Sequence, residues 1–132
     1  MSELKSTTKN INLRDRSYNF SLETIWFIGD VPRSDAHRII CDQLLRAATS
    51  IGANIIEAKS ASSRKDFVKF YEISLKSANE TKYWLGLLID SGIISKTLEQ
   101  KAVDLLGEAG ELCKMLGSSL LTLKGKKLKD FS

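Results

Sequence analysis

Residues able to carry acid–base or metal chemistry are few in this chain of 132 residues, and their spacing matches no common site. His37 is the single histidine. Zinc sites draw on several cysteine or histidine ligands at short spacings, whereas Cys41 and Cys113 stand far apart. No glycine-rich phosphate loop follows a predicted strand. We therefore predict no catalytic residue, no metal site and no cofactor, and a protein that is not an enzyme.

Carboxylates need a separate test, because helical bundles hold di-metal centres with glutamates and Glu-x-x-His pairs. Glu57, Glu72, Glu80 and Glu108 each lack the histidine three residues on. A di-metal centre is therefore not expected either.

The two cysteines allow two interpretations, one disulfide or two free thiols. The segment 1–12 is polar and lacks the apolar stretch of a signal peptide, which favours free thiols in a reducing cytoplasm. The longest apolar runs span only a few residues, so no transmembrane helix and no membrane partner are expected.

Apolar residues recur with helical spacing over four segments, and no segment alternates as a strand would. Tyr18, Leu22, Ile25 and Trp26 mark the first segment. The other three each carry an inner face with steps of four and three. These faces are Ile40, Leu44, Ala47, Ile51, Asn54 and Ala58; Phe67, Tyr71, Ser74, Ala78, Thr81, Leu85 and Leu88; and Leu98, Ala102, Leu105, Ala109, Leu112, Leu116, Leu120 and Leu123.

The connections between these segments are short, so neighbouring helices must run antiparallel. The prediction is an all-α, antiparallel up-down-up-down four-helix bundle in a single domain, 1–132. Its helices cover 14–29, 35–59, 64–91 and 96–124, and the tails 1–12 and 125–132 are expected to be flexible.

Capping residues support these boundaries. Ser34, Ser63 and Ser95 precede three of the helices, and Asp66 stands three residues after Ser63, as in a capping box. Gly29 is expected to end the first helix in a left-handed conformation, before Pro32.

The second helix contains a group of small residues and a group of polar residues. Each group allows two interpretations. Ala47, Ala48, Ser50, Gly52 and Ala53 favour close helix packing inside the bundle, or contact with another subunit. Asn54, with Glu57 nearby and Asn79-Glu80 in the next helix, indicates a buried hydrogen-bonded pair that sets helix register. The alternative is a binding or catalytic role.

Residues 43–58, QLLRAATSIGANIIEA, resemble the signature of the bacterial ribosomal-RNA intervening-sequence protein family, also grouped as a ribosomal-protein superfamily. Residues 63–67 and 77–85 resemble its third helix. Gly52 stands where the family usually has proline and Ala58 where it has glycine. The resemblance spans residues 14–122 and implies a helical bundle related to the accessory protein of diversity-generating retroelements. That relative is a homopentameric ring that binds nucleic acid and a reverse transcriptase.

In an up-down-up-down bundle, both chain ends and the connection between the second and third helices lie at one end. That end collects 12 of the 20 basic residues with five acids (Glu3, Asp15, Glu57, Asp66, Asp130), a net of +7, which leaves −3 for the rest. Such segregation favours a polyanion site, with solvated tails as the alternative. The predicted nucleic-acid-binding residues are Arg14, Arg16, Lys59, Arg64, Lys65, Lys69, Lys124, Lys126, Lys127 and Lys129. Tyr18 and Phe67 lie near this end and could stack on bases, although both also fit the core.

A second expectation concerns assembly. Phe20, Trp26, Phe27, Ile56 and Trp84 lie off the inner faces and need cover, which predicts a homo-oligomer, with a pentamer favoured. The predicted function is thus an oligomeric bundle that binds RNA or DNA. The alternative is a structural adaptor for a protein partner.

Overall fold

The computed structural model describes residues 12–131, and the side chains of residues 12–125. Its four helices are α2 (Leu13–Asp30), α3 (Asp35–Lys59), α4 (Arg64–Ser91) and α5 (Lys96–Phe131). Of the tail predicted over residues 1–12, only Asn12 is among the described residues.

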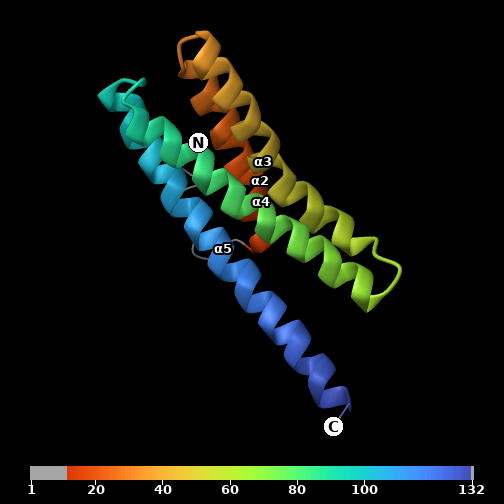
Figure 1. The fold of residues 1–132 in the computed structure, drawn as a ribbon. Helices are drawn as coiled ribbons and strands as arrows, with labels where there is room; N and C mark the ends of the chain where they lie inside the picture. The colour runs from red at the N-terminus through yellow and green to blue at the C-terminus, as the bar shows by residue number, and fades with distance from the viewer. Residues whose placement is uncertain (1–11, 132) are drawn as a thin grey trace.

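Helices that follow one another in the chain pack side by side and antiparallel, and α2 also packs against α5, which closes the bundle (Figure 1). The predicted up-down-up-down four-helix bundle is therefore confirmed. None of the described helices is long and apolar enough to span a membrane.

Each helix begins at a side-chain cap. The hydroxyl oxygens of Ser34, Ser63 and Ser95 accept hydrogen bonds from backbone N–H groups three residues on, at 3.3, 3.1 and 3.3 Å. These three caps confirm the prediction, and Asn12 caps α2 in the same way at 2.9 Å. Caps of this kind satisfy N–H groups that have no partner within the helix.

Two helix ends differ from the expectation. Gly29 lies within α2, which ends at Asp30 followed by an extended Val31, so the prediction of a left-handed Gly29 is wrong. Among the described residues, Gly92 after α4 is the glycine with positive φ, at 70°. Helix α5 continues to Phe131 rather than ending near Lys124, because no proline or left-handed glycine interrupts it.

The predicted inner faces of α3, α4 and α5 point into one core. Of those residues, all are buried except five that are half-buried, at the ends or edges of the faces: Ile40, Asn54, Phe67, Tyr71 and Leu123. In α3, Cys41 is buried instead of Ile40, and Ile55 is buried instead of Asn54. The three longest helices thus pack as their periodicity predicts.

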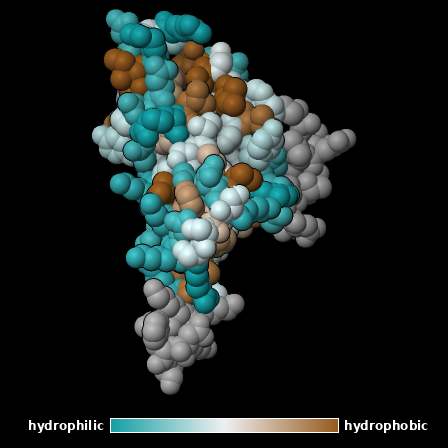
Figure 2. Space-filling model, turned by 90° about the vertical axis from the view of Figure 1, so that its right-hand side faces the viewer, coloured by the Kyte–Doolittle hydropathy of each residue, from teal (hydrophilic) through white to brown (hydrophobic). Residues whose placement is uncertain are grey.

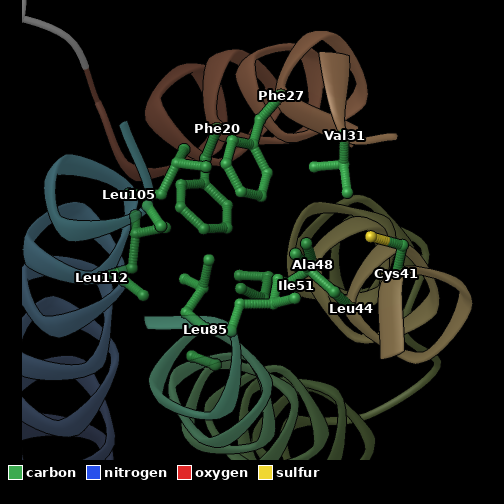
Figure 3. Close-up of a cluster of buried hydrophobic side chains, with 14 of the residues drawn as sticks. Phe20, Phe27, Val31, Cys41, Leu44, Ala48, Ile51, Leu85, Leu105 and Leu112 are labelled. Atoms are coloured by element: carbon green, nitrogen blue, oxygen red, sulfur yellow. The ribbon is translucent and has the colours of Figure 1, made fainter. Parts of the chain in front are cut away.

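Helix α2 packs with a face that its sequence did not single out. Its buried residues are Ser17, Phe20, Thr24 and Phe27. In Figure 3, Phe20 and Phe27 point from α2 towards Leu85 and Leu105 of the facing helices. The expectation that Phe20 and Phe27 lie outside the core is therefore wrong.

Small residues of α3 let α2 approach closely. A Cβ on Gly52 would lie 3.4 Å from the Cβ of Ser17, in van der Waals contact. Ala47 and Ala48 are fully buried. For these residues the interpretation as internal packing is confirmed, whereas Ala53 is exposed.

Candidate nucleic-acid interface

The end of α3 and the start of α4 bring four predicted site residues together. Lys59 ends α3, and Arg64, Lys65 and Lys69 lie in the first two turns of α4, across a connection of four residues. All four side chains are exposed. With Lys124 of α5 they form a surface that we call the basic end.

The connection is held by local hydrogen bonds. The N–H groups of Ser60 and Ala61 donate to the carbonyl oxygens of Glu57 and Ala58, at 3.0 and 3.1 Å. The Asp66 carboxylate accepts from the backbone N–H and the hydroxyl of Ser62, at 3.4 and 3.2 Å. Asp66, next to Lys65 in the sequence, is thus engaged in shaping the turn.

Lys59, Lys65 and Lys69 form no ion pair with any residue that the structure describes. Lys65 and Lys69 are four residues apart and therefore share one face of α4. Three ammonium groups close to one turn, without an acidic partner among the described residues, are the arrangement that attracts phosphates.

Other predicted site residues are engaged elsewhere. Lys124 lies 3.5 Å from Glu72, an acid that was expected to lie away from this end. Arg14 lies 3.4 Å from its neighbour Asp15. Lys126, Lys127 and Lys129 belong to α5, but their side chains lie outside the described residues.

Arg16 of α2 pairs with α5 and is not among the residues gathered at the α3–α4 turn. Its Nε and Nη2 donate to the two carboxylate oxygens of Glu108 on α5, at 3.0 and 2.6 Å, and Nη1 lies 3.3 Å from the Met115 sulfur. The hydrogen bond to Glu108 raises the pKa of Arg16, despite partial burial. Arg16 therefore holds α2 against α5.

A hollow of about 380 Å³ opens at the basic end. Its lining combines small or apolar residues with two of the cations. The lining residues are Ala58, Lys59, Ala61, Ser63, Arg64, Phe67 and Leu123. Leu123 reaches the hollow because α5 continues past this level (Figure 1).

A second hollow, of about 550 Å³, lies at the opposite end beside the α2–α3 connection, and His37 and Cys41 line it. His37 Nε2–H donates to the carbonyl oxygen of Ile93 at 3.0 Å, so it ties α3 to the α4–α5 connection. Burial raises the pKa of the Cys41 thiol, and Asp42 adds to the shift. Asp30 and Asp42 line this hollow together with Arg33 and Arg38, so it has no consistent charge.

Cys41 and Cys113 are both free thiols, as expected. No group of three or more histidine, cysteine or acidic residues gathers among the described residues as a metal site would require.

The polar residues of the family-like signature form a hydrogen-bonded layer between α3 and α4. The Asn54 amide nitrogen donates to the Ser50 carbonyl and hydroxyl oxygens, at 2.8 and 3.0 Å. The Ser77 hydroxyl of α4 donates to that Ser50 hydroxyl at 2.9 Å. Nearby, Arg46 pairs with Glu80 at 2.5 Å. Asn54 thus contributes to helix pairing through Ser50, rather than through a direct pair across the interface.

Large apolar side chains also remain exposed, most clearly on α2. Tyr18, Ile25 and Trp26 are 66, 47 and 42% exposed. They share the side of α2 that faces away from Phe20 and Phe27, and we call them the α2 stripe. Ile56 on α3 is 50% exposed. Figure 2 shows such apolar patches set among hydrophilic side chains on one face of the molecule.

The sequence indicates the basic residues but not the acids that pair with Arg16 and Lys124. Glu108 and Glu72 meet Arg16 and Lys124 across helix interfaces, and no local spacing in the sequence indicates those pairs.

The comparisons agree with the fold and the signature. The family model described as 23S rRNA-intervening sequence protein matches residues 9–118. The crystal structure of a protein of unknown function from the S23 ribosomal protein family of Bacteroides thetaiotaomicron VPI-5482 is 35% identical. It aligns with a TM-score of 0.74 over 83% of this chain and 98% of that chain. None of the curated proteins matches. The chain belongs to the 23S rRNA-intervening sequence protein family.

Proposed function

We propose that this protein is a non-enzymatic, oligomeric helical bundle that binds nucleic acid through its basic end. The observation that carries the proposal is the group Lys59, Lys65 and Lys69, exposed around one turn and without ion pairs among the described residues. The family description refers to an intervening sequence of 23S rRNA, so RNA is the first nucleic acid to test.

Binding of this kind does not depend on base sequence. Exposed ammonium groups contact phosphates, and each contact releases counterions from the nucleic acid. The affinity for RNA should therefore vary more with salt concentration than with nucleotide sequence.

Titration of the unmodified protein with a mixed-sequence RNA at increasing salt tests the proposal. The logarithm of the binding constant should fall linearly with the logarithm of salt concentration. With three or four phosphate contacts, the slope should be about −2 to −4. The measurement is fluorescence anisotropy of a labelled RNA. Absence of binding at low salt, or binding that salt leaves unchanged, would contradict the proposal.

The oligomeric part of the proposal is supported by the α2 stripe. Tyr18, Ile25 and Trp26 expose large apolar side chains on one helix, and exposed apolar patches usually mark contacts between proteins. Contact with a second copy would remove this surface from water. The family resemblance favours five copies.

Replacing Ile25 and Trp26 together with glutamate should convert the assembly into a monomer of 14.7 kDa, because buried charges without partners oppose association. Light scattering measures the mass, and circular dichroism should show unchanged helix content. A matched control replaces Val103 and Leu121 of α5, which are 43 and 75% exposed, with glutamate. Equal dissociation of both variants would mean that the α2 stripe is not the specific contact, and a monomeric unmodified protein would contradict the oligomer.

The α2 stripe also supports the second candidate function, a structural adaptor that binds a protein partner. The RNA titration separates the two functions, because an adaptor without a nucleic-acid role should not bind RNA even at low salt.

A further inference from the structure

The hollow at the basic end exists because α2 begins about one turn short of it. Ser17 of α2 lies against Gly52 of α3. From there α2 extends back four residues to Leu13, about 6 Å, whereas α3 continues seven residues to Lys59, about 10 Å. Beyond the start of α2 the described bundle has three helices, and no described residue of α2 lines the hollow at this end of the core.

The floor of the hollow is apolar and its rim is cationic. Ala58, Phe67 and Leu123 contribute carbon surface, while Lys59 and Arg64 stand beside it. Phe67 is half-buried and stacks on Tyr71, with ring centroids 4.8 Å apart and an angle of 25° between the planes. The ring is thus supported from one side and presents part of its surface to the hollow.

We propose that this hollow accepts an unpaired nucleobase, which stacks on Phe67 while the neighbouring phosphates lie near Lys59 and Arg64. The inference rests on the proposed nucleic-acid binding and gives its substrate class, a single strand or an unpaired loop. An apolar floor suits the face of a base and not a phosphate, whereas the cations suit the backbone on either side. A paired base in a duplex is stacked within the helix and cannot enter.

The experiment compares two DNA strands of equal length, oligothymidylate and a strand of abasic nucleotides, which carry the same phosphates. Anisotropy titrations at one salt concentration give both affinities. The unmodified protein should bind the thymidine strand about 5- to 150-fold more tightly, the range for one stacked base. The affinity for a duplex of the same length should not depend on Phe67, because a paired base cannot reach the ring.

Phe67→Leu should remove most of that preference and leave the salt dependence unchanged, because no phosphate contact is lost. Phe67→Tyr retains an aromatic ring and should preserve the preference. Circular dichroism checks that both variants fold. If Phe67→Leu does not fold, the comparison of the two strands with the unmodified protein still tests whether a nucleobase contributes to binding.

The outcomes separate the two proposals. Equal and salt-dependent binding of both strands would overturn the nucleobase site and leave phosphate binding at the basic end in place. No binding of any strand, RNA included, would overturn the proposed function itself. A preference for thymidine that Phe67→Leu leaves intact in a folded protein would also overturn the assignment to this hollow.

Discussion

Replacing Phe20 with alanine should lower the free energy of unfolding by about 3 to 5 kcal/mol, the range for a buried phenylalanine. Phe20 is 1% exposed and belongs to the same core cluster as Phe27, Leu85 and Leu105. These side chains meet at the centre of the bundle (Figure 3). Removal of the ring leaves a cavity that four long helices cannot close without losing other contacts. Urea denaturation followed by circular dichroism measures the change.

The matched control is Tyr18→Ala on the opposite side of the same helix. Tyr18 is 66% exposed, so its replacement should cost less than about 1 kcal/mol in the folded chain. Both variants are compared as monomers, at a protein concentration below that of assembly, because assembly would bury Tyr18 and add a concentration-dependent stabilisation. A larger loss for Tyr18 than for Phe20 would show that α2 packs with its other face.

The quadruple variant Lys59→Gln, Arg64→Gln, Lys65→Gln and Lys69→Gln should bind RNA on the order of 100- to 1,000-fold more weakly at low salt. Each lost phosphate contact should also reduce the salt slope by about 0.7 to 0.9. The loss should be similar for every RNA sequence, because phosphates carry no sequence information. Helix content should remain, since all four side chains are exposed.

A control with the same change in net charge replaces Arg33, Lys96, Lys101 and Lys114 with glutamine. Arg33 lies at the α2–α3 connection and the three lysines on α5. At least two of them already lie near an acid, with Lys101 3.5 Å from Asp30 and Lys114 3.9 Å from Glu111. This variant should retain most of the affinity. Equal losses from both variants would indicate diffuse charge attraction instead of binding at the basic end.

Much of the fold could be predicted from local patterns. The inner faces of α4 and α5 follow a single apolar periodicity, with Ser74, Ala78 and Leu85, for example, all buried as expected. The serine caps at Ser34 and Ser63 are local as well, because each hydroxyl bonds an N–H three residues away. Interactions over three or four residues are contained in the sequence pattern itself.

The candidate site was predictable in part, for a topological reason. Short connections make neighbouring helices antiparallel, so Lys59 and Lys69 must lie at the same end. The hollow was not predictable, because it depends on how far α2 extends relative to α3. That offset follows from the contact of Ser17 with Gly52, which joins residues distant in the sequence.

The sequence by itself determined the helices, their order and the inner faces of α3, α4 and α5, because one apolar periodicity and local caps suffice for these. Only the tertiary structure decided which face of α2 is buried. Phe20 and Phe27 are spaced seven residues apart, and so are Tyr18 and Ile25. Periodicity cannot choose between two apolar stripes on one helix. The choice depends on contacts with other helices, such as Ser17 against Gly52 and Arg16 with Glu108.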